Sequence, residues 1–197
     1  MFFGDSLPLT DPAALRFRMS TLKTGVWLGL AMIACGQWYF VLTWRDGHRT
    51  LLSAIVLSLA VFDVSVLLGL GQMRRIVAGR WREAFFLNWT LANVASLLLL
   101  GAIDPTNPSP LALPLLMPML FAGMSYPRRS AAVCCTAVVV GYAAEAIAKG
   151  SNLAYSELFL MCLVWTAGMC LWQARNREQQ HAELESQARR AGASVAR

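Results

Sequence analysis

Charged residues are scarce in this chain of 197 residues. They make up 14% of the sequence, whereas a typical soluble domain carries about 25%. The charges that exist are clustered, so that long neutral stretches lie between them, and hydrophobic residues make up 57% of the chain. This composition excludes an ordinary soluble domain. It predicts an all-α integral membrane protein, because helices satisfy their own backbone hydrogen bonds inside a bilayer.

Residues for metal or catalytic chemistry are also lacking. The only histidines are His48 and His181, and both lie outside the apolar stretches, so we expect no metal site and no haem inside the membrane. No P-loop, GxSxG or HExxH pattern occurs. We therefore expect no catalytic residues, no cofactor and no enzymatic activity in this chain.

The cysteines and the net charge have simple interpretations. The five cysteines all lie in apolar stretches without CxxC spacing, which is typical of small packing residues; they are Cys35, Cys134, Cys135, Cys162 and Cys170. The net charge of +6 lies mostly in polar segments between the apolar stretches. No basic stripe interleaved with aromatic residues is present, so we expect no nucleic-acid partner.

Six apolar stretches are long enough, or nearly so, to cross a bilayer. They are 25–44, 51–71, 85–103, 111–125, 130–148 and 153–173. The expected organisation is a cytoplasmic N-terminal segment (1–24), a six-helix membrane domain (25–173), and a cytoplasmic linker helix with a frayed end (174–197). The lipid bilayer is thus the first expected partner.

The fourth stretch is unusual because it is rich in proline. Residues 104–129 hold six of the eight prolines of the chain. Pro114 and Pro118 would each cost about 3 kcal/mol inside a soluble helix, but neighbouring helices can satisfy the backbone groups they leave unpaired in a membrane. We expect a short, kinked transmembrane helix here. The alternative is five spans with this segment re-entrant.

The distribution of positive charge favours six spans. With the N-terminus inside, 14 of the 17 Lys and Arg residues are cytoplasmic, as the positive-inside rule requires. The three others are Arg45, Arg49 and Lys149. We therefore expect a multi-pass protein of the cell membrane with both termini in the cytoplasm.

Asp63 is the one charged residue deep in an apolar stretch. A carboxylate there is costly unless it is protonated or paired, so it is a candidate functional residue. We expect it to be largely protonated and to bond a neutral partner, which is one of Asn93, Asn88, Gln37, Ser65 and Thr90. It is either a polar clamp between helices or a proton or ligand site.

Two further carboxylates, Glu145 and Glu157, flank Lys149 near the outer ends of the last two stretches. Their simplest interpretation is an interfacial cap or a salt bridge at the rim. The alternative is that they line the outer mouth of a ligand site.

The C-terminal tail favours a helix, since residues 175–191 contain good helix formers and no Gly or Pro. Leu184, Ala188 and Ala191 form one weak apolar seam at coiled-coil spacing. The tail is either a solvated helix that frays after Gly192 or a linker that dimerises and passes a signal from the sixth span.

The second half of the chain resembles a known family. The run LPLLMPMLFAGMSYPRRSAA, a helix rich in small residues, a sixth span and the tail WQARNREQQHAELESQARR are similar to the membrane-sensor region of bacterial GGDEF-type diguanylate cyclases. The matching positions are Pro114, Pro118, Tyr126, Pro127, Arg128 and Arg129. The resemblance covers residues 111–190 best, and histidine kinases and class III nucleotide cyclases use similar six-helix modules.

The resemblance implies a bacterial inner-membrane sensor that signals to a cyclase-type output domain, fused or separate. The chain has no GGDEF signature, so we expect that it does not itself make cyclic di-GMP. Our first hypothesis is a non-catalytic, homodimeric input module for a small ligand. The alternatives are a small transporter or channel with Asp63 as coupling residue, which lacks support from internal symmetry, and a scaffold subunit.

Overall fold

The computed structural model describes residues 12–69, 75, 77–79 and 81–195, and this part of the chain is helical, with no strand. The helices are α1 (Pro12–Leu42), α2 (Arg49–Leu68), α4 (Arg82–Ile103), the 3₁₀ helix η1 (Pro110–Leu115), α5 (Leu116–Ser125), α6 (Arg128–Ala148) and α7 (Leu153–Val195). The prediction of an all-α fold is confirmed.

Among the described residues, five helices are long and apolar enough to cross a membrane. The qualifying segments are Met19–Leu42, Arg49–Val66, Arg82–Ile103, Arg128–Ala148 and Leu153–Gln180, and a shorter apolar segment covers Pro110–Ser125. The structure therefore supports a multi-pass membrane protein.

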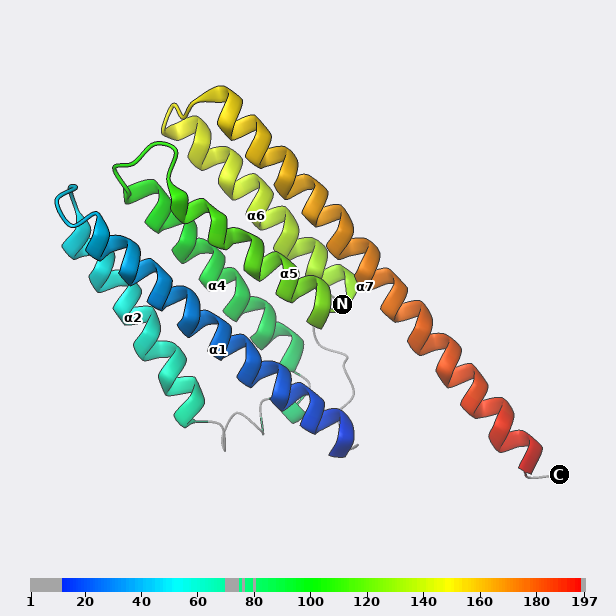
Figure 1. Ribbon diagram of the computed structural model, residues 1–197. Helices are drawn as coiled ribbons and strands as arrows, with labels where there is room; N and C mark the ends of the chain where they lie inside the picture. The colour runs from blue at the N-terminus through cyan, green and yellow to red at the C-terminus, as the bar shows by residue number, and fades with distance from the viewer. Residues whose placement is uncertain (1–11, 70–74, 76, 80, 196–197) are drawn as a thin grey trace.

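Successive helices run up and down in an elongated bundle (Figure 1). The turns 43–48, 104–109 and 149–152 lie together at one end, which we call the loop end. The start of α1, the turn 126–127 and the departing part of α7 lie toward the opposite end, which we call the tail end. The η1–α5 segment runs from the loop end toward the tail end, antiparallel to α4.

The proline-rich segment forms a 3₁₀ turn followed by a ten-residue α-helix. The Ser109 side chain caps η1 by accepting a hydrogen bond from the Leu111 amide at 3.2 Å. Pro114 lies inside η1, and Pro118 is the third residue of α5. The Leu116 amide at the start of α5 bonds the Leu113 carbonyl of η1, so the two helices are continuous, and Pro118 removes one backbone donor just after their junction.

The helices α4 to α7 pack closely, and small residues allow it. A Cβ at Gly123 of α5 would lie 2.8 Å from Cβ of Cys170 in α7. A Cβ at Gly141 of α6 would lie 2.3 Å from Cδ1 of Leu98 in α4. Helices in a membrane approach one another closely where such residues lie at the interface. The cysteines Cys134, Cys135 and Cys170 are buried in this core.

The α1–α2 hairpin packs chiefly on itself. It joins the other helices near the loop end through a small apolar cluster in which Phe40, Leu52 and Val56 meet Leu100 and Leu111. Toward the tail end, Leu22 and Val26 of α1 belong to the main core. The hairpin is thus a distinct layer beside the four closely packed helices.

The last helix is continuous from the bundle into the tail. α7 extends over 43 residues, and Figure 1 shows it running past the tail end of the bundle. The tail helix predicted over 175–191 is therefore present, and it continues past Gly192 to Val195. The side chains of the predicted seam, Leu184, Ala188 and Ala191, lie outside the described part of the structure.

Candidate functional site

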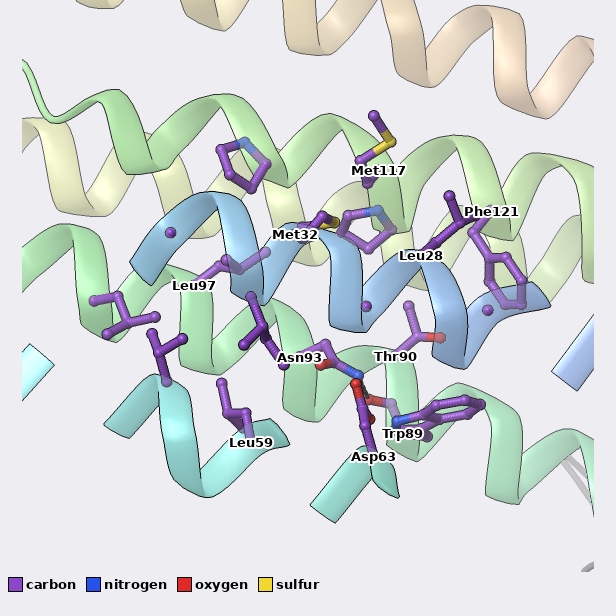
Figure 2. A pocket seen from close by; sticks show the side chains of 18 of the residues that line it. Leu28, Met32, Leu59, Asp63, Trp89, Thr90, Asn93, Leu97, Met117 and Phe121 are labelled. Atoms are coloured by element: carbon purple, nitrogen blue, oxygen red, sulfur yellow. Dashed lines mark hydrogen bonds between the residues drawn. The ribbon is translucent and has the colours of Figure 1, made fainter. Parts of the chain in front are cut away.

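A cavity of about 120 Å³ lies between the α1–α2 hairpin and the helices α4, η1 and α5 (Figure 2). Most of its wall is apolar, and both predicted kink residues, Pro114 and Pro118, contribute to it. The apolar side chains include Leu28, Met32, Leu59, Leu97, Met117 and Phe121. The proline-rich segment therefore helps to build the site, because residues of both η1 and α5 line it.

One end of the cavity is polar. Asp63 of α2 is only 3% exposed and lines the cavity together with Trp89 and Asn93 of α4. Figure 2 shows these three side chains pointing toward one another. Asn93 donates from Nδ2 to the backbone oxygen of Trp89 at 3.0 Å. The indole Nε1–H of Trp89 is buried and donates a hydrogen bond to the carboxyl group of Asp63.

Gly29 of α1 leaves space for the carboxyl group of Asp63. A Cβ at Gly29 would lie 2.6 Å from Oδ2 of Asp63. That distance is far below a van der Waals contact, so any side chain at position 29 would displace the carboxyl group. Gly25 and Gly36 of α1 also line the cavity. The cavity is thus lined by small residues of α1 as well as by residues of η1 and α5.

The structure brings together only part of the predicted polar site. Asn93 lies beside Asp63 at the cavity, whereas Asn88 is exposed. Gln37 bonds Ser53 within the hairpin, where its Nε2 donates to the Ser53 carbonyl at 3.0 Å and its Oε1 accepts from the Ser53 hydroxyl at 2.7 Å. Asn88 points elsewhere on the helical wheel because it lies five positions from Asn93, and a helix has 3.6 residues per turn.

The two predicted outer-mouth residues do not share a site with Asp63. Glu145 is half-buried, and a Cβ at Gly101 would lie 2.5 Å from its Oε1. Its Oε2 is buried without a hydrogen bond among the described residues. Glu157 is exposed. Neither residue lines the cavity.

A buried ion pair at the loop end escaped the sequence reasoning. Nη1 of Arg49 lies 2.9 Å from Oδ1 of Asp104, and the two side chains are 1% and 0% exposed. Asp104 also accepts hydrogen bonds from the hydroxyls of Thr106 and Ser109, each at 2.6 Å. Tyr39 donates to Asp104 at 3.3 Å. The pair joins the hairpin to the α4–η1 turn.

The pKa of Asp104 reflects this environment. Burial opposes its ionisation, but the hydrogen bonds from Ser109 and Thr106 and the charge of Arg49 outweigh burial and lower its pKa. The sequence contains a signal for this turn, since Asp followed two residues later by Thr is typical of a turn in which the carboxylate accepts from the backbone. Here the Thr106 amide donates to Oδ1 of Asp104 at 3.2 Å.

Lys149 completes the loop end. Its Nζ donates to the backbone oxygens of Gly101, Asp104 and Thr106 at 2.8, 2.8 and 3.1 Å. The last carbonyls of a helix lack intrahelical donors, and a cation is favourable near them. Lys149 therefore caps α4 from the α6–α7 turn.

At the tail end, α7 clamps the turn between α5 and α6. The guanidinium of Arg177 donates to the backbone oxygens of Gly123, Met124 and Tyr126 at 2.9, 2.5 and 2.7 Å. Oε1 of Glu178 accepts from the Arg128 amide at 2.8 Å. Arg177 thus caps the end of α5, and Glu178 caps the start of α6.

Tyr126 connects this clamp to the cavity. Its hydroxyl donates to the backbone oxygen of Phe86 at 2.8 Å and bonds the hydroxyl of Thr90. Thr90 lines the cavity beside Trp89. A continuous set of contacts therefore joins the polar end of the cavity to α7. Sequence reasoning identified Tyr126 only through the family resemblance and did not identify Arg177.

Comparison of the chain with protein-family models, with curated proteins and with solved structures gives no match.

Proposed function

We propose that this chain is a non-catalytic membrane input module that passes a signal through α7 to a cytoplasmic output domain of the GGDEF type. The observation that supports this proposal is the attachment of one continuous helix, α7, to the α5–α6 turn by Arg177 and Glu178. A rigid helix held at this turn must respond when the turn moves.

The proposal includes six spans, with η1–α5 as the short fourth span. This segment runs from the loop end toward the tail end, as a span would (Figure 1). Both termini then lie on the side that carries 14 of the 17 Lys and Arg residues, which is the cytoplasm by the positive-inside rule. The protein works as a homodimer joined through the tail.

The contacts from Thr90 through Tyr126 to Arg177 supply a route for the signal. A change at the cavity that moves Thr90 alters the hydrogen bond between the hydroxyls of Thr90 and Tyr126. Tyr126 in turn lies at the α5–α6 turn, whose backbone oxygens accept from Arg177. Spatial connection alone does not establish coupling, so the route needs a functional test.

The test is a fusion of a GGDEF domain after Arg197, with cyclic di-GMP as the readout. Insertion of four residues into the exposed part of α7 rotates the output domain by about 40°, whereas insertion of seven residues nearly restores its orientation, since a helix has about 3.6 residues per turn. We expect the four-residue insertion to change cyclic di-GMP output and the seven-residue insertion to preserve it.

Substitution of Arg177, which bonds the α5–α6 turn, is the second part of the test. Arg177→Ala should also change the output, and Arg175→Ala, which alters an exposed side chain nearby, should leave it as in the parent fusion. If neither the insertions nor Arg177→Ala changes the output, the tail does not transmit a signal and the proposal is wrong.

A second function is favoured by one observation, the cavity that borders Asp63 in the last third of α2. It is a small transporter or channel in which Asp63 couples transport to proton binding. Purified protein in liposomes should then carry a proton current that Asp63→Asn abolishes. Absence of flux in the parent protein contradicts this alternative.

A further inference from the structure

We propose that the cavity holds part of one acyl chain of a bilayer phospholipid, and that this chain enters sideways between α1 and α5. The depth of the cavity in the membrane, its wall, its narrow shape and its open side each support this occupant.

The cavity lies within the membrane-spanning part of the protein. All the residues that line it belong to the apolar segments Met19–Leu42, Arg49–Val66, Arg82–Ile103 and Pro110–Ser125. The medium beside such segments is hydrocarbon, since the hydrocarbon core of a bilayer is about 30 Å thick. Lipid chains are therefore the molecules that surround the protein at the level of the cavity.

The wall favours an apolar occupant, because the polar groups at one end already bond within the protein. Asp63 accepts from the Trp89 indole, and Asn93 donates to the Trp89 carbonyl at 3.0 Å. The hydroxyl of Thr90 bonds the hydroxyl of Tyr126. The rest of the wall consists largely of Leu, Ile, Val, Met and Phe side chains. An apolar cavity stays free of water and takes up hydrocarbon.

The shape suits an unbranched chain. Along α1 the lining residues extend from Gly25 to Gly36, which is roughly 16 Å at 1.5 Å per residue and about half of a 30 Å hydrocarbon core. The enclosed volume is only about 120 Å³, less than the roughly 150 Å³ of an engineered cavity in another protein that binds benzene. A space so long and of so small a volume is narrow, so it fits a few methylene groups in a row better than a ring system.

Access is from the side that faces lipid. Leu28 of α1 and Met117 of α5 line the cavity and are each 46% exposed, and both are seen in Figure 2. The helices α1 and α5 are not among the closely packed pairs of the bundle. They approach toward the tail end, where a Cβ at Gly25 would lie 3.1 Å from the ring of Phe121. A chain thus enters beside Leu28 and Met117.

A chain in this position contacts both the α1–α2 hairpin and the other helices. The bilayer then supplies part of the packing between these two layers of the molecule. A role for the chain as a stimulus of the input module rests on the proposed function, whereas its binding does not.

The test is photolabelling of the purified full chain in phosphatidylcholine vesicles that contain phosphatidylcholine with a diazirine on one acyl chain. Probes with the diazirine at several depths along the chain cover the length of the cavity. We expect adducts, located by mass spectrometry, on Val56 and Leu100, which line the cavity and are only 4% and 2% exposed. Met161 of α7, which is 69% exposed, reports labelling from the bilayer itself. A sterol with a diazirine in its ring system should label Met161 and leave Val56 and Leu100 unlabelled.

Variants that fill the cavity are the second part of the test. Gly36 lines the cavity, and a Cβ there has no atom within 4 Å, so a side chain can be added without a backbone clash. Gly36→Ala should reduce the labelling of Val56 and Leu100, and Gly36→Leu should abolish it, with the labelling of Met161 unchanged. The matched control is Gly168→Leu. Gly168 of α7 also has open space at its Cβ but does not line the cavity, so this variant should label like the parent.

Three results would each overturn the inference. The first is a parent protein labelled at Met161 but not at Val56 and Leu100, which would show an empty or closed cavity. The second is equal labelling of Val56 and Leu100 in the parent and in Gly36→Leu, or its loss in Gly168→Leu, which would show that the adducts do not report the cavity. The third is labelling of both residues by the sterol, which would contradict an unbranched chain. None of these results involves the GGDEF fusion, so failure of the lipid site and failure of the signalling proposal are distinguishable.

Discussion

At the scale of single residues, Asp63 shows how the protein accommodates a buried carboxyl group, which costs free energy when it has no partner. It is buried against Gly29 and faces Trp89 and Asn93. Asparagine has nearly the same shape and keeps a polar end, so Asp63→Asn should change the free energy of unfolding little. Asp63→Leu should cost about 1–3 kcal/mol more, because it leaves its polar neighbours without a partner.

Thermal melts can be followed through the reactivity of the buried thiols Cys134, Cys135 and Cys170, which unfolding exposes. If the Asn and Leu variants melt at the same temperature, Asp63 does not act as a polar clamp between helices.

Asp104 gives the molecule a dependence on pH. Its pKa is lowered in the folded state by Ser109, Thr106 and Arg49 despite burial, so its ionised form stabilises the fold. That contribution is fully present above the unfolded pKa of about 4 and is lost as the pH falls through the lower, folded pKa. Asp104→Asn removes the buried anion of Arg49, which keeps only the 45% exposed Asp46 at 3.2 Å, and should cost about 3 kcal/mol near pH 7.

The difference in stability between the parent and Asp104→Asn should shrink as the pH is lowered below about 4. Unfolding in denaturant at a series of pH values measures it. A difference that stays constant from pH 7 to pH 3 would show that the ion pair does not contribute in this way. Asp46→Asn removes the other carboxylate partner of Arg49, whose side chain is 45% exposed, and should cost less than about 1 kcal/mol at either pH, because exposed ion pairs contribute little.

At the scale of secondary-structure elements, Arg177 holds the end of α5. Arg177→Ala removes its three hydrogen bonds to backbone oxygens, so the α5–α6 turn should open more often. Amide hydrogen exchange in residues 123–130 should become faster, with little change at the loop end. Arg175→Ala should not alter exchange, and unchanged exchange in Arg177→Ala would contradict the clamp.

The tail helix carries a prediction about assembly. A helix of this length with one weak apolar seam is marginal alone in water, so we expect it to pair with a second copy with Leu184 facing Leu184. Cysteine placed at Leu184 should crosslink readily between protomers, and cysteine placed at Glu183 poorly. Weak and equal crosslinking at both positions would indicate a solvated, monomeric tail.

Much of the fold follows from the sequence because apolar length and helix propensity act locally. The long helices and the uninterrupted passage from the sixth stretch into the tail are visible in this way. The 3₁₀ helix at the start of the proline-rich segment could not be predicted in this way, because it depends on where each proline lies relative to the first amides of the helix.

The candidate site was predictable only in part. Asp63 stands out because a lone carboxyl in an apolar stretch is rare, and Asn93 follows from its place on a neighbouring helix. The Arg49–Asp104 pair joins residues 55 positions apart, and Arg49 looked like an ordinary loop charge. Trp89 looked like any apolar aromatic residue. Contacts of this kind depend on helix packing, which the pattern of a single sequence does not encode.

At the scale of the whole molecule, the topology is the main prediction. Reporter fusions after Arg82 and after Arg190 should read cytoplasmic, and a fusion after Asn107 should read outside, because 14 of the 17 positive residues then face the cytoplasm. A periplasmic signal from the fusion after Arg190 would contradict six spans and would favour the five-span alternative.

The continuity of α7 also has a mechanical consequence. Its 43 residues correspond to a rod of roughly 64 Å at 1.5 Å per residue. In the proposed signalling, the contact with the α5–α6 turn at Arg177 is the fulcrum, and the 18 residues from there to Val195 form a lever arm of about 27 Å. A tilt of about 10° at the fulcrum would sweep the far end of this arm through about 5 Å, roughly one helical pitch. In the proposed homodimer, a displacement too small to open the bundle would thus be large enough to shift the two α7 helices relative to each other.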